Sequence, residues 1–291
     1  MRTGGNLSYM ELFTIPNEPA IVTQTRQNIL ESFKDLEFIE EGHQYFLHGK
    51  SLCSVSGIAH RFESRPFDEE LQARRYAERN GKTPEYWIAQ WHCNSFKATT
   101  LGTKTHAFGE SLGYLRNGHP ELIHPSMRSQ FMEENNYLAP IHPKEEAVVS
   151  FFNNLPPSYH LVLNEAMVYS GKNPDPARNL KEQICGTFDM LYYYDGTGNS
   201  PQSGFLVLDY KTNNELKSEY NRSHSIHFLP PFDDIIEESL GAYTIQLSLY
   251  SLMLEDIGIP VIGRAIIWLK GDGTFQTIPL PDVSERLRNA L

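Results

Sequence analysis

Cysteine is scarce in this chain, and no stretch of it is apolar for long enough to cross a bilayer. The three cysteines, Cys53, Cys93 and Cys185, are odd in number and far apart. They argue against a disulfide framework, a zinc knuckle and a four-cysteine iron–sulfur cluster. The start of the sequence lacks the basic-then-apolar pattern of a signal peptide. We therefore expect inert thiols, no iron–sulfur cluster, no membrane partner and a cytoplasmic location.

Positive charge is in deficit, since the formal net charge is -11. An acidic protein is at first a poor partner for nucleic acid, which is itself an anion. The distribution of charge weakens that objection, because an acidic run at 233–238 lies apart from a basic stretch. The basic stretch comprises Arg61, Arg65, Arg74, Arg75, Arg79, Lys82, Lys97 and Lys104. Net charge therefore lowers the expectation of a nucleic-acid partner without deciding it.

Internal repeats and low-complexity tracts are also missing, and 291 residues suffice for one large domain or one and a half. A hairpin is predicted over 36–52, with a turn at Glu41-Gly42. Helices are predicted at 66–90 with breaks at 80–81 and 84, at 96–116, from about 145, and at 235–257. Strands are predicted at 160–169, 183–194, 204–212, 261–269 and 274–280. Loops are predicted at 118–145 and 213–234.

This order of elements predicts an α/β (α+β) fold in which helices flank a central mixed sheet. We divide the chain into residues 1–95, an N-terminal hairpin and helical region, and residues 96–291, the core. The core contains every strand of the predicted central sheet.

Two aspartates and a lysine interrupt two otherwise apolar strands. Asp189 lies in the first strand and Asp209 in the second, with Lys211 on the same face because strand side chains alternate. If the two strands pair as a hairpin, Asp189 lies opposite Asp209, and buried charges persist only when they are paired or metal-bound. Carboxylates of this kind hold Mg²⁺ or Mn²⁺, and a lysine beside them neutralises charge on a reacting phosphate. The alternative is a solvent-exposed Asp–Lys pair, which the apolar run 205–208 disfavours.

His106 lies on a predicted helix face that it shares with Gly102, Gly109 and Gly113. Each glycine costs a helix roughly 1 kcal/mol relative to alanine, but it lets another backbone or a substrate approach closely. A histidine on such a face is a candidate metal ligand, although a lone helical histidine more often has a structural role.

Three further polar residues are candidates for the same site. Glu165 lies in the strand predicted at 160–169 and would hold a metal-bound water or orient Lys211; a surface position is the alternative. Gln246 and Tyr250 lie four residues apart on the last long helix, so they share one edge of it. Both can hydrogen-bond to phosphate or base, whereas the alternative places Tyr250 in the apolar core.

Together these residues resemble the PD-(D/E)xK nuclease superfamily, and specifically its RecB-like exonuclease branch. The matching elements, in order, are Gly-Thr-Lys-Thr-His at 102–106, Asn-Glu at 164–165, Gly-Thr-Phe-Asp at 186–189, Leu-Asp-Tyr-Lys-Thr at 208–212 and Gln-Leu-Ser-Leu-Tyr at 246–250. No phosphate loop of the Gly-Lys-Thr type is present. The chain therefore resembles the stand-alone members found in phages and in the mitochondrial genome maintenance exonuclease group.

The resemblance implies a restriction-endonuclease-like core and a role for each matching residue. The metal, Mg²⁺ with Mn²⁺ as a substitute, would be held by His106, Asp189, Asp209 and the main-chain carbonyl of Tyr210. Lys211 would be the catalytic lysine and Glu165 the upstream acidic residue. Further candidates for substrate binding are Gln246, Tyr250, Thr212, Arg74 and Arg75.

We therefore expect a Mg²⁺-dependent deoxyribonuclease that acts on DNA ends or single strands in replication, recombination or repair, with a recombination or replication protein as a further partner. The segment 61–104 would form a wall for a single strand, with Tyr86, Trp87 and Trp91 stacking on bases. The alternatives are a structure-selective endonuclease on the same core and a non-catalytic DNA-binding or recombination-partner module.

Overall fold

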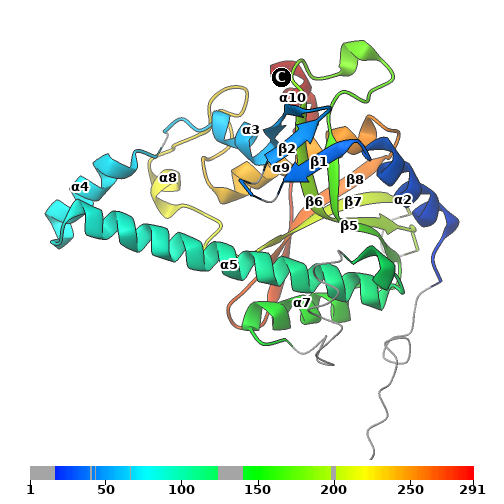
Figure 1. The fold of residues 1–291 in the computed structure, drawn as a ribbon, viewed down its shortest axis with the longest axis horizontal. Helices are drawn as coiled ribbons and strands as arrows, with labels where there is room; N and C mark the ends of the chain where they lie inside the picture. The colour runs from blue at the N-terminus through cyan, green and yellow to red at the C-terminus, as the bar shows by residue number, and fades with distance from the viewer. Residues whose placement is uncertain (1–16, 40, 43, 66, 124–139, 198–200) are drawn as a thin grey trace, which may run out of the picture.

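A mixed sheet forms the centre of the molecule in the computed structural model, which describes residues 17–39, 41–42, 44–65, 67–123, 140–197 and 201–291 (Figure 1). Its six strands are β4 (Cys53–Ser54), β5 (Tyr159–Tyr169), β6 (Ile184–Tyr194), β7 (Gly204–Lys211), β8 (Val261–Leu269) and β9 (Phe275–Pro279). The order is β4-β6-β7-β8-β9, and β5 pairs with β6 along its other edge. The β4–β6 and β7–β8 pairs are parallel, and the other pairs are antiparallel.

Helices cover both faces of this sheet, each over its own apolar cluster. On one face lie α5 (Pro84–Arg116) and α7 (Pro143–Asn154). On the other lies α9 (Ser239–Glu255), packed against α3 (Val55–Arg61) and α10 (Ser284–Ala290), while α2 (Ala20–Ser32) runs against β5. This confirms the predicted α+β fold with a central mixed sheet flanked by helices. Among the described helices, none is both long and apolar enough to cross a membrane.

The N-terminal region forms its predicted hairpin and a helix pair. Strands β1 (Leu36–Ile39), β2 (Gln44–Leu47) and β3 (Lys50–Ser51) make a separate antiparallel sheet, and the first turn contains Gly42 at a φ of 84°. Helix α4 (Glu69–Asn80) is capped by Asp68 and stops before Gly81, whose φ is 69°. The predicted break at 80–84 is therefore confirmed.

Helix α5 is longer than the sequence pattern predicts. It begins at Pro84, where the Thr83 side chain accepts a hydrogen bond from the Tyr86 amide, and not at Phe96. The predicted start was wrong because Pro84 occupies the first turn of a helix, where proline is favoured, and that helix continues without a break through residues 91–95. The domain boundary placed between residues 95 and 96 consequently lies inside one continuous 33-residue helix.

Four helices, α2, α3, α8 (Glu219–Ser223) and α10, fall where the sequence gave no helical signal. The buried face of α2 includes Thr25 and Arg26, so its hydrophobic periodicity is weak. The segment predicted as a loop after β7 contains α8, and α10 closes the chain. Helix α9 begins at Ser239, four residues later than predicted. Part of the predicted loop over 118–145, residues 124–139, lies outside the described residues.

An opening in the sheet lies along one edge of β6. That edge is paired with β4 at Ile184 and Cys185, and with β7 from Met190 onward. Between these pairings, residues 186–189 have no ladder partner on that edge. The gap places the end of this segment, Asp189, where strands β6 and β7 separate.

Glycines on α5 allow the helix to lie close to the sheet, as predicted for the face that carries His106. A Cβ atom on Gly109 would lie 2.6 Å from the Tyr210 ring of β7, and one on Gly113 would lie 2.6 Å from the Asn164 amide of β5. At Gly102, the nearest atom to such a Cβ would be Thr212 Oγ1 at 3.4 Å, an ordinary contact. Close packing of α5 on β5 and β7 therefore depends on Gly109 and Gly113.

We predict that Gly109→Ala destabilises the protein, because the buried Tyr210 ring would have to move, at a cost of about 1–3 kcal/mol that exceeds the gain in helix propensity. The matched control, Gly102→Ala, should be stabilised by about 1 kcal/mol. Urea unfolding of both variants measures the difference. Equal stability of the two would contradict the packing described here.

Candidate metal centre

Three carboxylates lie on one rung of three neighbouring strands. Glu165 of β5 lies between the pairs Asn164↔Met190 and Ala166↔Phe188, which places it level with Asp189 of β6. Asp189 and Asp209 are one residue beyond the last β6–β7 pair, Met190↔Leu208. The predicted hairpin register, with Asp189 opposite Asp209, is thus confirmed. The Tyr210 amide turns to Asp189 and donates a 2.7 Å hydrogen bond to its Oδ2 atom.

His106 completes this cluster from the other side. Its Nδ1 atom lies 3.2 Å from Asp189 Oδ2 and 3.7 Å from Glu165 Oε1. The side chains of His106 and Glu165 are 27% and 31% exposed, whereas those of Asp189 and Asp209 are 9% and 3% exposed. An ion or substrate can therefore reach the cluster from the side of His106 and Glu165, over a floor formed by the two aspartates.

Lys211 is the second cation of the cluster. Its ammonium forms an ion pair with the buried Oδ2 atom of Asp209. The ammonium also lies 4.3 Å from the ring centroid of Tyr243 on α9, whose hydroxyl donates a 2.8 Å hydrogen bond to Asn213. A cation over an aromatic face is held electrostatically by the ring. The sequence had placed Asp209 and Lys211 on one face, but it gave no signal for Tyr243.

The mutual repulsion of the carboxylates appears in their pKa values. Burial, reinforced by the charge of Asp189, raises the pKa of Asp209 to about 7. Burial and Asp189 also raise the pKa of Glu165. For Asp189 itself, burial is outweighed by His106, and its pKa is lowered. Asp189 is therefore the carboxylate of the group that ionises most readily, whereas Asp209 and Glu165 keep their protons to higher pH.

The two cations respond in the opposite sense. Burial disfavours the charged form of His106, but the Asp189 and Glu165 carboxylates outweigh it and raise the pKa well above its ordinary value. The same balance raises the pKa of Lys211, through Asp209 and Asp189. Both side chains are therefore positively charged at neutral pH, and they supply the charge that the carboxylates need.

Glu165 is held in a strained backbone conformation. Its φ is 48°, in the left-handed region that side chains with a Cβ rarely occupy. Such a residue costs of order 1–3 kcal/mol and persists only where its surroundings enforce it. This conformation interrupts the regular β5–β6 ladder at the position where the Glu165 carboxylate approaches His106.

Gln246 and Tyr250 lie on α9, and the structure brings only Tyr250 directly to the strand that carries Asp189. The Tyr250 ring packs on Phe188, and a Cβ on Gly186 would lie 2.8 Å from its hydroxyl oxygen. Tyr250 is 3% exposed, and burial raises its pKa well above the ordinary value. Gln246 is half-buried and hydrogen-bonds to Tyr250. Tyr250 thus packs against the strand that carries Asp189, and Gln246 contacts Tyr250.

Arg74 and Arg75 lie far from the cluster. Both are exposed on α4, which lies beside the end of α5 that projects beyond the sheet (Figure 1). Arg74 pairs with Glu70 at 3.3 Å. Thr212, in contrast, directly follows Lys211, and its carbonyl accepts a hydrogen bond from the buried Lys144 ammonium. The sequence gave no signal for Lys144, which lies at the start of α7.

The aromatic residues of the predicted wall have partly structural roles. Trp87 contacts Tyr76 and Tyr86, and Trp91 contacts Tyr76, all in edge-on arrangements. These rings join α4 to α5. Tyr86 keeps 47% of its surface exposed, so of the three aromatic residues expected to stack on bases it has the best access to a ligand.

The donor atoms of the cluster fit a divalent cation. Ligand atoms of His106, Glu165 and Asp189 all lie within 4.8 Å of one another. Asp209 adds a buried carboxylate to this group, and its Oδ2 atom is already paired with the Lys211 ammonium. Carboxylate oxygens with one imidazole nitrogen suit Mg²⁺ or Mn²⁺. The compact group contains Glu165 in the place where Asp209 was expected, because Lys211 draws the Asp209 carboxylate to itself.

Comparison with known proteins adds no family to this description. No protein-family model matches the chain, and no curated protein matches it. The function has to be inferred from the donor atoms and their geometry.

We predict that the metal-free protein loses stability as pH rises from about 4 to 7. The pKa of Asp209 is raised to about 7 in the folded state, from 3.8. Its protonation therefore stabilises the fold, fully below pH 3.8, and this contribution is lost as Asp209 ionises. Unfolding by urea in EDTA at several pH values measures the slope. Asp209→Asn should flatten it, and an identical slope in both proteins would contradict the assignment.

We predict that Glu165→Gly is more stable than Glu165→Ala by about 1 kcal/mol, because only glycine adopts the left-handed conformation without strain. Both variants lack the carboxylate, so their difference isolates the backbone. At the neighbouring Ala166, a glycine should instead destabilise the strand by about 0.5–1 kcal/mol. Thermal unfolding of the three variants tests the prediction, and greater stability of Glu165→Ala would refute the strain.

Proposed function

We propose that this protein is a Mg²⁺-dependent deoxyribonuclease that hydrolyses phosphodiester bonds, acting on DNA ends as an exonuclease. The observation that carries the proposal is the convergence of Asp189, Asp209 and Lys211 with His106 where β6 and β7 separate. The order of these residues in the chain agrees with the RecB-like branch of the PD-(D/E)xK superfamily, which is the family we propose.

The metal would be held by His106, Asp189, Asp209 and the main-chain carbonyl of Tyr210, with Glu165 as a further ligand at its accessible side. When bound, Mg²⁺ or Mn²⁺ acts as a Lewis acid on the phosphodiester and lowers the pKa of a water molecule. The hydrogen bond from the Tyr210 amide fixes the Asp189 carboxylate in direction. His106 must lose its proton to bind a metal, so metal binding releases protons.

Lys211 neutralises charge that develops on the phosphate oxygens. Its raised pKa keeps the ammonium protonated at neutral pH, so it acts as an electrostatic catalyst and not as a base. Tyr243 and Asp209 hold the ammonium in place. Glu165, whose pKa is raised by burial, is suited to orient the attacking water or to take its proton.

Substrate contacts would come from residues around the opening. Thr212 directly follows Lys211, and Gln246 hydrogen-bonds to Tyr250, which packs against the strand that carries Asp189. Arg74 and Arg75 would contact DNA only through a strand long enough to reach the projecting end of α5. Charge gives little support to that contact, because Glu69, Glu70, Glu78 and Glu85 balance the basic residues there.

We expect wild-type protein with Mg²⁺ to release nucleotides from end-labelled linear DNA, single-stranded or duplex. Asp209→Ala and Lys211→Ala should each abolish the release, because one removes a metal ligand and the other removes charge stabilisation worth orders of magnitude in rate. Lys217→Ala, which removes an exposed lysine outside the cluster, is the control and should retain activity.

Covalently closed circular DNA completes the experiment. An exonuclease leaves it intact, whereas nicking of the circle would favour a structure-selective endonuclease. Binding of DNA without cleavage under any divalent metal would favour a binding module. Unchanged activity in both the Asp209→Ala and Lys211→Ala proteins would refute the mechanism.

A further inference from the structure

Strand β5 departs from regular geometry twice within four residues. The register with β6 shifts between Leu161 and Leu163, so Val162 is an extra residue in a bulge. Three residues later, Glu165 has its left-handed φ of 48°. Leu163 and Asn164 lie between the two irregularities, and the backbone of Asn164 directly precedes Glu165.

Tyr114 of α5 fixes the backbone of Asn164 on both sides. The Asn164 amide donates to the Tyr114 hydroxyl, and this hydroxyl donates to the Asn164 carbonyl, each over 2.8 Å. Both backbone groups point away from β6, toward the edge of β5 that has no neighbouring strand among the described residues. Tyr114 is 3% exposed, so water does not compete for these groups. One hydroxyl thus replaces the partner strand at this position.

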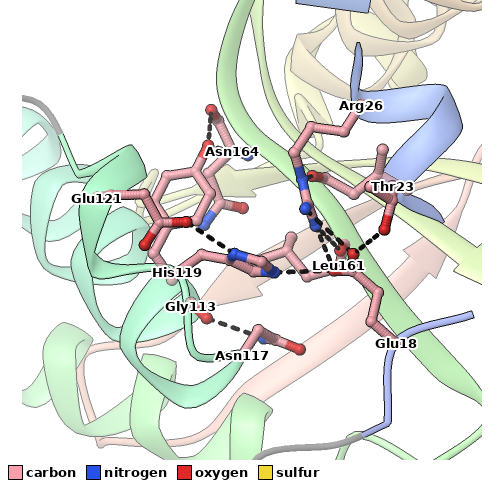
Figure 2. Close-up of polar contacts among 11 residues, drawn as sticks. Glu18, Thr23, Arg26, Gly113, Asn117, His119, Glu121, Leu161 and Asn164 are labelled. Carbon is pink, nitrogen blue, oxygen red and sulfur yellow. Dashed lines mark hydrogen bonds and ion pairs between the residues drawn. The ribbon is translucent and has the colours of Figure 1, made fainter. Parts of the chain in front are cut away.

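Two further contacts keep Asn164 in place. Its side-chain amide donates to the Glu110 carbonyl over 3.2 Å, in space left by Gly113. The preceding bulge is held by the buried Arg26, which donates to the Val162 carbonyl over 2.8 Å and to the Leu161 carbonyl over 3.4 Å. Figure 2 shows the Arg26 guanidinium beside Leu161 and Glu18, and Glu18 also contacts His119. The backbone that precedes Glu165 is therefore held by hydrogen bonds at Leu161, Val162 and Asn164.

We propose that Tyr114 is a positioning residue for the metal centre. Its hydroxyl holds Asn164 so that Glu165 keeps the left-handed conformation that directs its carboxylate to His106 and Asp189. Without the hydroxyl, β5 relaxes toward a regular strand, and Glu165 turns away from the cation. The inference deepens the proposed function and rests on the metal centre that this function requires.

The test is Tyr114→Phe, which keeps the ring in the core and removes only the hydroxyl. We expect it to bind Mn²⁺ roughly tenfold more weakly or worse, the usual effect of losing a residue that orients a ligand. Electron paramagnetic resonance of free Mn²⁺ measures the dissociation constant without any DNA. The matched control is Tyr192→Phe, because the Tyr192 hydroxyl is buried in the same apolar cluster and has no hydrogen-bond partner among the described residues. It should bind Mn²⁺ as wild type does.

A double-mutant cycle with Glu165→Gln separates positioning from a general loss of structure. If Tyr114 acts through Glu165, then Tyr114→Phe has no further effect on Mn²⁺ affinity once Glu165→Gln is present. Additive effects of the two substitutions would overturn the inference, and so would wild-type affinity in Tyr114→Phe. If Tyr114→Phe fails to fold, hydrogen exchange of the wild-type Asn164 amide tests the inference instead. Slow exchange supports the hydrogen bond from this amide to the Tyr114 hydroxyl, and fast exchange overturns the inference.

The proposed function and the inference fail in different ways. Wild-type protein that binds Mn²⁺ but cleaves no DNA would contradict the nuclease alone, and Tyr114→Phe would still weaken binding. Cleavage that persists with unchanged Mn²⁺ affinity in Tyr114→Phe would contradict the role of Tyr114 alone. Wild-type protein that binds no Mn²⁺ would contradict both.

Discussion

The crowding of carboxylates on one rung of the sheet is the constraint on which the rest of the site depends. Asp189, Asp209 and Glu165 repel one another in a largely buried place, and burial, together with the charge of Asp189, raises the pKa values of Asp209 and Glu165. Buried charge of one sign is costly unless opposite charge is close. His106 and Lys211 provide it, one from α5 and one from β7. A divalent cation would place two positive charges at a single point among these carboxylates.

The strands depart from regular β geometry at the positions where the charged side chains lie. Strands β6 and β7 separate at Asp189 and Asp209, and β5 turns left-handed at Glu165. Glycines on α5 bring the helix close to the sheet, which carries His106 to the carboxylates. The strain at Glu165 has no evident structural benefit, and stored strain of this kind is typical of functional sites.

The sequence predicted the strands and the facing aspartates well, because period-two alternation and apolar runs are local signals. It predicted Lys211 beside Asp209 for the same reason. Contacts between distant segments left no such signal, because they depend on how the helices pack on the sheet. Examples are the contacts of Tyr243 with Lys211, of Tyr114 with Asn164 and of Lys144 with Thr212. The start of α5 was missed because residues 91–95 gave no helical signal, although the helix continues through them. The existence of α2 was missed because its buried face contains Arg26.

The most direct test of the central claim is anomalous diffraction from crystals of the protein soaked in Mn²⁺. The account predicts an anomalous peak between His106, Asp189 and Asp209, with the His106 ring and both aspartates as ligands, and no such peak in Asp209→Ala crystals. Crystals that show no peak there, with His106 still in direct contact with Asp189, would contradict it.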